Sequence, residues 1–408
     1  GSPRVVNPGH LYWLCSGVSR RHRQKSIKPF GQEMILPIPE PQFLAQYWQK
    51  KPLLCPRALP QFESPLSPEE LAGLAMEPDI ESRMVWQQKG IWRQQNGPFE
   101  ENDFKGTEPW TLLVQRVDHW HDAVAALRQT LPALPRWRFD DVMVSYATDG
   151  AGVGPHFDRY DVFLLQGSGR REWRIGPTCD DDTPQLTENG LNLIPPFEAH
   201  ETYLLEPGDV LYIPPGVAHW GIAQGDSMTF SLGFRAPRIA DLLARRVDAV
   251  LEQLADSALL EDGLTSNIPC RPGEITPEHL ANARDAMHNA IDALDDDRWL
   301  AEVVTECTDD SDAQMMTLHT PLQTTVHPPL VPDSVRLKSA CKVAWMERPQ
   351  GVELFIDGEF EKMSLHSLDL IITLCQGDSV SWAALEQSDS VLGEFLQRTD
   401  ALVASDEY

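Results

Sequence analysis

Between residues 140 and 234, short runs of β-forming residues alternate with turns built from Gly, Pro and Asp. Short strands at such close spacing are typical of a β-sandwich or barrel. The runs are 142–146 (VMVSY), 161–166 (DVFLLQ), 172–175 (EWRI), 201–205 (ETYLL) and 210–213 (VLYI). We therefore predict a mainly β fold with α additions, built on a double-stranded β-helix, or jelly-roll, core.

The residues before this segment have a different character. Residues 40–130 are predicted to be mixed and mainly helical, with one helix beginning at Ser67, which serves as N-cap before Pro68. A further helix is expected over 118–130. Residues 1–33 hold six basic residues against one acid, and we interpret them as a flexible extension outside the fold. The jelly-roll domain and its N-terminal helices are then expected to span 34–240.

The residues after the β-rich segment turn helical and acidic. Residues 241–312 contain 18 acidic and 5 basic side chains. An apolar stripe at helical spacing needs a partner, either another domain or another copy of the chain. The stripe consists of Leu242, Leu243, Val247, Val250, Leu251 and Leu254. We predict a helical region over 241–318 and, after a Pro-rich linker at 320–332, a small α+β unit completing a C-terminal domain at 319–408.

The bulk composition limits the classes of partner. A formal net charge of -27 argues against general affinity for nucleic-acid phosphates and suits a basic protein partner. Residues 333–408 alone carry 6 basic against 14 acidic residues, so we expect no direct nucleic-acid binding.

Seven cysteines without a CxxC pair favour a reducing cytoplasm. No apolar run approaches the ~20 residues that span a bilayer, so no membrane association is expected.

One motif in the β-rich segment predicts a metal centre. His156 and Asp158 follow a Gly-rich entry, GVGP, and side chains two apart on a strand point to the same face. His219 follows on a later strand, after the turn at PGD and the bend at PPG. Two imidazoles and one carboxylate form the facial arrangement that holds Fe(II) with open positions for a co-substrate and O2. We regard His119 and His121 as a weaker alternative, because residues two apart on a helix diverge.

A co-substrate anchor is also present in the sequence. If 2-oxoglutarate chelates the iron through its 2-oxo acid end, its distal carboxylate lies deep in the barrel and requires a cation. Arg171 is our candidate, since strand alternation separates it from the neighbouring Arg170 and Glu172. Ser145, on the strand before the metal loop, is expected to add a hydroxyl group.

Several stretches resemble the JmjC (cupin-fold) oxygenases, and in particular the bacterial ribosomal oxygenases that hydroxylate ribosomal-protein arginine. The stretches are 48–54 (WQKKPLL), 70–77 (ELAGLAME), 152–176 (GVGPHFDRYDVFLLQGSGRREWRIG), 205–221 (LEPGDVLYIPPGVAHWG) and 231–237 (SLGFRAP). The resemblance implies His156, Asp158 and His219 as iron ligands. It likewise implies Arg171 as the anchor of 2-oxoglutarate, with Ser145 as its helper.

The same resemblance implies a substrate and an assembly. The substrate is an arginine of a large-subunit ribosomal protein, hydroxylated at its β-carbon, and the assembly is a homodimer formed by the helical region. The C-terminal domain is implied to be winged-helix-like. Asp149 is our candidate for contacting the substrate arginine, although a plain turn residue is the simpler interpretation. Tyr160 is close enough to the metal motif to line the pocket, although a core position is its default.

Two alternatives stay open at this point. A JmjC hydroxylase or demethylase acting on another protein residue would keep the chemistry and change the target. A non-catalytic, cupin-type binding protein would keep the fold and lack turnover. Succinate production and the modified residue distinguish these from an arginine hydroxylase.

Overall fold

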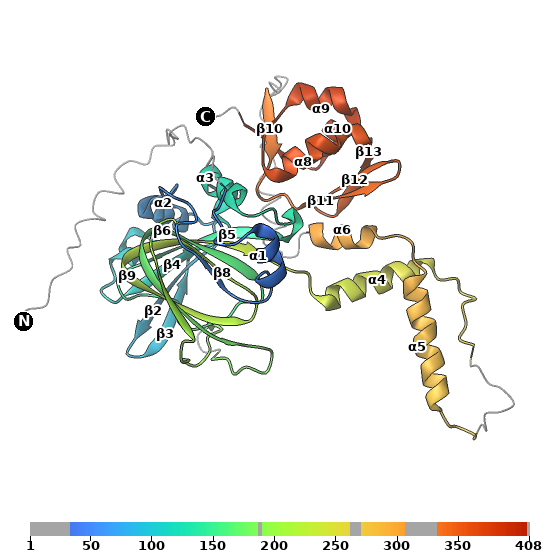
Figure 1. The fold of residues 1–408 in the computed structure, drawn as a ribbon, viewed down its shortest axis with the longest axis horizontal. Helices are drawn as coiled ribbons and strands as arrows, with labels where there is room; N and C mark the ends of the chain where they lie inside the picture. The colour runs from blue at the N-terminus through green and yellow to red at the C-terminus, as the bar shows by residue number, and fades with distance from the viewer. Residues whose placement is uncertain (1–32, 187–189, 262–270, 307–332, 406–408) are drawn as a thin grey trace, which may run out of the picture.

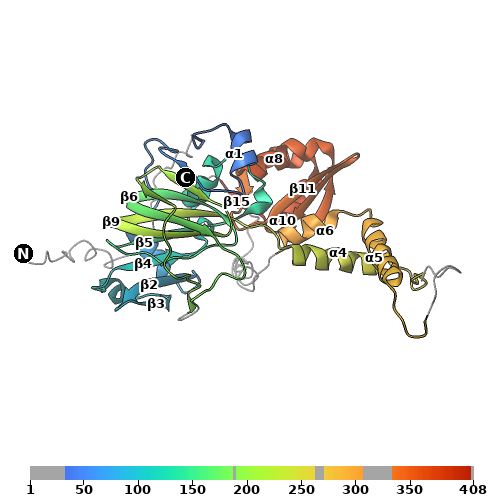
Figure 2. The same ribbon diagram turned by 60° about the horizontal axis from the view of Figure 1, so that its bottom comes forward.

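A computed structural model describes residues 33–186, 190–261, 271–306 and 333–405. The predicted extension, apart from Glu33, and the predicted Pro-rich linker lie outside these residues. The main sheet has nine strands in the order β1-β8-β6-β9-β5-β4-β2-β3, with β7 paired to β6. Figure 2 shows β6, β9, β5, β4, β2 and β3 following one another across it. This sheet is mainly antiparallel and rolled, as expected for a jelly roll.

Two long strands form the centre of the sheet, β6 (Asp161–Thr178) and β9 (Val217–Phe234). Along β9, Phe230 and Leu232 pack into the outer core beneath the N-terminal helices, whereas Thr229 and Ser231 face inward. Both faces are buried, which explains the near-continuous burial of the strand. The neighbouring strands are β5 (Phe139–Ala147), β7 (Glu201–Leu205) and β8 (Val210–Ile213). The two sequence runs at 161–166 and 172–175 therefore belong to one strand, not two.

The prediction that residues 40–130 are mixed and mainly helical overlooked the strands of this segment. Four strands of this segment join the main sheet: β1 (Leu53–Cys55), β2 (Ser82–Gln88), β3 (Ile91–Asn96) and β4 (Trp110–Val114). The helical parts are α1 (Glu40–Gln46), α2 (Pro68–Ala75), η2 (Glu101–Lys105), η3 (Val117–His119), α3 (Asp122–Ala125) and η4 (Ala126–Thr130). A further short turn, η5 (Arg136–Arg138), follows the segment. Pairing of β4 with β5 extends the sheet, so tertiary pairing overrides local helix preference.

The predicted helix start at Ser67 is confirmed. The Ser67 side chain accepts from the N–H of Glu70, and Glu70 returns the bond to the N–H of Ser67. The helix predicted over 118–130 is instead a series of short helical turns. One reason lies at Asp118, whose carboxylate accepts a hydrogen bond from the N–H of Val142 on β5. That contact ties the segment to the sheet.

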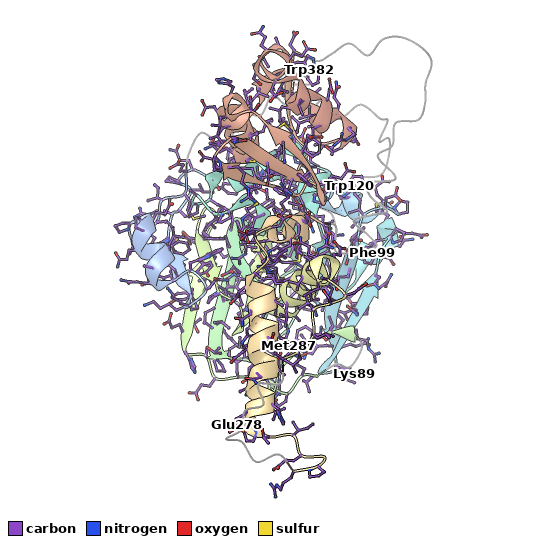
Figure 3. The ribbon with its side chains drawn as sticks, turned by 90° about the vertical axis from the view of Figure 1, so that its right-hand side faces the viewer. Lys89, Phe99, Trp120, Glu278, Met287 and Trp382 are labelled. Carbon is purple, nitrogen blue, oxygen red and sulfur yellow. The ribbon has the colours of Figure 1, made fainter. Side chains whose placement is uncertain are left out.

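The acidic region forms an arm of three helices, α4 (Ile239–Gln253), α5 (Pro277–Asp292) and α6 (Arg298–Thr305). Arg246 on α4 donates to the carbonyls of Ile291 and Leu294 at the end of α5, which stabilises the carboxyl end of that helix. Figure 1 shows α5 extending away from the jelly roll and from the C-terminal unit. Figure 3 labels Glu278 and Met287 along this helix.

The C-terminal unit is a separate α+β body with its own core. Its strands are β10 (Ser334–Leu337), β11 (Val343–Arg348), β12 (Gly351–Ile356), β13 (Glu359–Met363), β14 (Val380–Ser381) and β15 (Leu402–Ala404). Its helices are η7 (Leu365–Ser367), α8 (Leu368–Gln376), α9 (Trp382–Ser388) and α10 (Ser390–Arg398). Ser339 donates to Asp118 at 2.6 Å, which joins the unit to the jelly roll. Its winged-helix-like character stays a prediction.

No helix in the described ranges has the length and apolarity to cross a membrane.

Candidate metal and co-substrate site

Three side chains from distant parts of the jelly roll meet at one point. The Nε2 atom of His219 lies 3.5 Å from Asp158 Oδ2, and the Nε2 atom of His156 lies 4.0 Å from the same oxygen. One potential ligand atom from each residue falls within 4.8 Å of the others. Among the described residues, this trio is the one group of His, Cys, Asp and Glu with such geometry. His119 and His121 do not form part of a comparable cluster there.

The structure corrects how His156 and Asp158 are held. We expected both on a strand, but they lie in an irregular loop between β5 and β6. Gly154 has φ +89, which a side chain would strain, and a Cβ on Gly152 would come within 2.2 Å of the Gly221 carbonyl. The Gly-rich entry therefore bends the chain toward β9. There His156 and His219 exchange two backbone hydrogen bonds, of 3.1 and 2.8 Å, which fix their positions.

Backbone carbonyls orient both imidazole rings. His156 Nδ1 lies 3.0 Å from the carbonyl of Gly154, and His219 Nδ1 lies 2.9 Å from the carbonyl of Val217. With Nδ1 acting as donor, the unprotonated Nε2 atom faces the cluster, which is the arrangement of metal-binding histidines. Burial, with a contribution from His219, lowers the pKa of His156 to about 4. The ring is therefore neutral at physiological pH and ready to bind a cation.

Asp158 is held in its ionised form. Burial alone would raise its pKa, but the hydrogen bond from His219 and the proximity of both imidazoles lower it to about 2. The Tyr160 hydroxyl contributes a further hydrogen bond to this carboxylate. Tyr160 thus contacts a member of the cluster directly.

Arg171 lies on the inner face of β6 and is 5% exposed. Its Nη1 donates to Ser145 Oγ at 2.8 Å, and its Nη2 donates to Ser227 Oγ at 3.2 Å and to the Ser227 carbonyl at 3.3 Å. No carboxylate of the described residues pairs with it. Burial lowers the pKa of Arg171 to about 10, so the side chain stays cationic at neutral pH. A buried guanidinium held only by neutral groups can receive an anion.

Sequence reasoning missed Ser227, which binds Arg171 from β9. A signal for it was present, since Ser227, Thr229 and Ser231 place a hydroxyl at every second position of the otherwise apolar run 227–234. Such alternation indicates a polar inner face.

A cavity of about 290 Å³ lies at the mouth of the jelly roll, beside Tyr160. Its walls contain both acidic and basic groups: Glu81, Asp140 and Asp141 with Arg83, Arg116 and Arg235. Burial, reinforced by the nearby Asp118 and Asp140 carboxylates, raises the pKa of Asp141 to about 7. Tyr160 is common to both, since it lines this cavity and hydrogen-bonds Asp158 of the cluster.

Asp149 is exposed and lies at the turn that follows β5. Its Oδ1 accepts a hydrogen bond of 2.7 Å from the N–H of Gly225. This contact joins two loops at one end of the sheet. A role in substrate contact stays a prediction.

Residues 126–242 match the JmjC domain family. The chain is 41% identical over 277 residues to the ribosomal protein uL16 3-hydroxylase of Escherichia coli (strain K12), covering 67% of this chain and 73% of that protein. It is 30% identical over 367 residues to a probable ribosomal oxygenase of Haemophilus influenzae, covering 84% of this chain and 87% of that protein.

Solved structures agree with these sequence relatives. The X-ray structure of E. coli YcfD superimposes with a TM-score of 0.73 at 32% identity, covering 91% of this chain and all of the other. The E. coli ribosomal oxygenase YcfD in complex with cobalt and 2-oxoglutarate matches with a TM-score of 0.70, again at 32% identity over 91% of this chain and 99% of that one. The fold prediction of a jelly-roll, cupin-like core is thereby confirmed.

Proposed function

Because this chain belongs to the JmjC-domain ribosomal oxygenases, we propose that it hydroxylates an arginine side chain, at the β-carbon, in a large-subunit ribosomal protein. The cofactors are Fe(II), 2-oxoglutarate and O2. The observation that carries the proposal is the convergence of His156, Asp158 and His219 beside a buried guanidinium, Arg171, that no carboxylate of the described residues neutralises.

The donor set of the cluster suits Fe(II). Two neutral imidazoles and one carboxylate on one side of an ion leave the opposite positions open for a co-substrate and O2. His156, Asp158 and His219 would hold the ion, with their orientation set by the Gly154 and Val217 carbonyls. The hydrogen bond from Tyr160 would keep the Asp158 carboxylate turned toward the metal.

Bound iron and 2-oxoglutarate would together supply O2 activation and hydroxylation of an unactivated C–H bond, with decarboxylation to succinate. Arg171 would bind the distal carboxylate of 2-oxoglutarate, with Ser145 and Ser227 fixing the guanidinium plane. The apolar side chains around β6, such as Val162, Leu164 and Trp173, exclude water from the inner face.

Recognition of a basic substrate is supported by charge. The net charge of -27 would attract an Arg-rich protein and raise its association rate at low salt. Asp149, which is exposed, and Tyr160, in the cavity wall, are our proposed substrate contacts. We propose the cytoplasm as the compartment, since the cysteines within the described ranges are free: Cys55, Cys179, Cys341 and Cys375.

We also propose that the partner of the helical arm is a second copy of the chain. On α4, Ile239, Leu243 and Leu251 are 77%, 54% and 61% exposed. Such an apolar face on a projecting arm is typical of an oligomer interface. Sedimentation of the full chain should give the mass of a dimer, and Leu243→Glu with Leu251→Glu should give a monomer; a wild-type monomer would contradict the assembly.

Turnover tests the proposed reaction. The full chain is incubated with Fe(II), 2-oxoglutarate, ascorbate and a panel of ribosomal-protein peptides that contain arginine. We expect succinate together with a mass gain of one oxygen on an arginine, and we expect neither from His219→Ala. Formaldehyde release, or oxygen on histidine, asparagine or lysine, would favour another JmjC target. Absence of succinate under every condition would favour a binding protein.

A further inference from the structure

Arg83 is a cation without a partner at the mouth of the jelly roll. It lies on β2 and lines the cavity of about 290 Å³, and its side chain makes no hydrogen bond or ion pair with any described residue. Its Nε atom is buried with no acceptor. The rest of the side chain is half-buried and faces the cavity. The buried Nε–H is unfavourable as it stands, because it has lost water and no acceptor replaces it.

Other arginines of the same region are neutralised within the chain. Arg235, in the wall of the same cavity, forms an ion pair with Asp140. Arg138 lies behind the sheet and pairs with Asp161 at 2.8 Å. Arg83 therefore resembles Arg171, whose described partners are hydroxyl and carbonyl oxygens and not a carboxylate.

Arg83 and the anchor residue share one face of the sheet. Arg83 on β2 is directly opposite Leu113 on β4, and Leu113 is directly opposite Ser145 on β5. Opposed residues in antiparallel strands project to the same side. Ser145 in turn accepts the hydrogen bond of Arg171. Two guanidinium groups without a carboxylate partner thus border the same interior.

Arg83 is also close to the metal cluster. Its charge contributes to the lowered pKa of His156, after burial and His219. A cation so near two imidazoles weakens metal binding when Asp158 is the one anion of the cluster. The position of Arg83 is explained if a bound ligand brings negative charge next to its guanidinium group.

We propose that Arg83 binds the carboxylate at the 2-oxo acid end of 2-oxoglutarate, while Arg171 binds the distal carboxylate. This inference rests on the proposed function, because it requires the co-substrate at the metal. A carboxylate that binds a metal through one oxygen keeps a second oxygen that needs donors. Arg83 would supply them from the cavity side, and the co-substrate would then have a guanidinium at each end.

Binding of two ligands to the Co(II)-loaded full chain, measured by calorimetry, separates the two ends. Pyruvate contains the 2-oxo acid end alone, whereas 2-oxoglutarate contains both. We expect Arg83→Gln to raise the Kd of both ligands by about 10-fold to 100-fold, the range for a hydrogen bond to a charged group. Arg171→Gln should raise the Kd of 2-oxoglutarate and leave that of pyruvate unchanged.

Arg235→Gln is the matched control, since it removes the same charge from the same cavity where Asp140 already neutralises it. It should leave the Kd of pyruvate within about 2-fold of wild type. Arg83→Lys retains the charge without the forked geometry and should recover part of the loss. An unchanged or higher Co(II) affinity, together with an unchanged or higher unfolding midpoint without ligand, would show that Arg83→Gln is folded.

The inference is overturned if Arg83→Gln binds pyruvate as wild type does. A rise in the KM of the peptide alone would make Arg83 a substrate contact instead, and also overturns it. If the wild-type, Co(II)-loaded chain binds neither 2-oxoglutarate nor pyruvate, the proposed function itself fails, which is a separate result.

Discussion

The inner and outer faces of the jelly-roll sheet both bury charged side chains, but they treat charge differently. On the outer side, the Asp161 carboxylate accepts hydrogen bonds from Arg138 at 2.8 Å and from the Tyr212 hydroxyl at 2.5 Å. On the inner side, the buried Arg171 contacts hydroxyl and carbonyl oxygens, and the half-buried Arg83 side chain contacts no acceptor among the described residues. On the outer face, charged side chains are therefore paired with an opposite charge, whereas on the inner face these arginines are not.

This difference separates structural charge from functional charge. A buried ion pair maintains the fold, and breaking it leaves a charge without solvent or partner. A buried cation held by neutral groups contributes little to stability and much to ligand binding. The following predictions test whether the two faces differ in this way, from the largest expected effect to the smallest.

Removing a proposed metal ligand should have the largest effect. Asp158→Ala leaves two imidazoles without the carboxylate that balances the ion, so turnover of 2-oxoglutarate should fall by more than about 100-fold, beyond the loss typical of an outer-shell change. Succinate formation and Co(II) affinity measure this. Asp161→Asn, on the outer face, is the comparison. The folded fraction of this variant should bind Co(II) with the affinity of the wild type. Equal loss of Co(II) affinity in both would contradict the separation of the two faces.

The two buried arginines should respond oppositely in stability. Arg138→Met leaves Asp161 buried without its cation, and the free energy of unfolding should fall by about 3 kcal/mol. Arg171→Met removes a cation that has no carboxylate partner, so the unfolding free energy of the ligand-free chain should stay the same or rise. Urea denaturation of both variants measures the difference. A loss of similar size in both would mean that Arg171 is structural.

Asp141 should make stability depend on pH. Its folded pKa of about 7 lies above the ordinary value of 3.8, so its contribution is present below about pH 4 and is lost as pH rises through 7. Asp141→Asn does not titrate and should be more stable than wild type at pH 8, by about 2 kcal/mol after allowance for partial exposure. At pH 4 the difference should disappear. A difference that does not change with pH would rule out titration of Asp141.

The smallest effect concerns Tyr160. Tyr160→Phe removes the hydrogen bond to Asp158, and the Kd of Co(II) should rise by about 10-fold, the lower range for partners of metal ligands. Tyr146→Phe is the matched control, because its hydroxyl donates to Asp226, away from the cluster. If both variants bind Co(II) as wild type does, the Tyr160 hydroxyl does not orient the ligand.

Part of this architecture could be predicted from local pattern. The strands at 201–205 and 210–213 and the capped start of α2 at Ser67 follow from short-range chemistry, and the structure contains all three. Residues 82–114 were misjudged because their strands are stabilised by pairing with β5, which is remote in sequence. The loop around His156 was misjudged because Gly152 and Gly154 permit an irregular path that no periodicity describes.

The amino-acid sequence by itself determined which groups could bind a metal and a dicarboxylate: the spacing of His156 and Asp158, a later His219, and an arginine at 171. Only the tertiary structure decided that these groups meet, that Ser227 supports Arg171, and that Arg83 is left without a partner beside them. The physical reason is that neutralisation of a buried charge depends on neighbours from other strands, whereas spacing along a chain specifies only what each strand can offer.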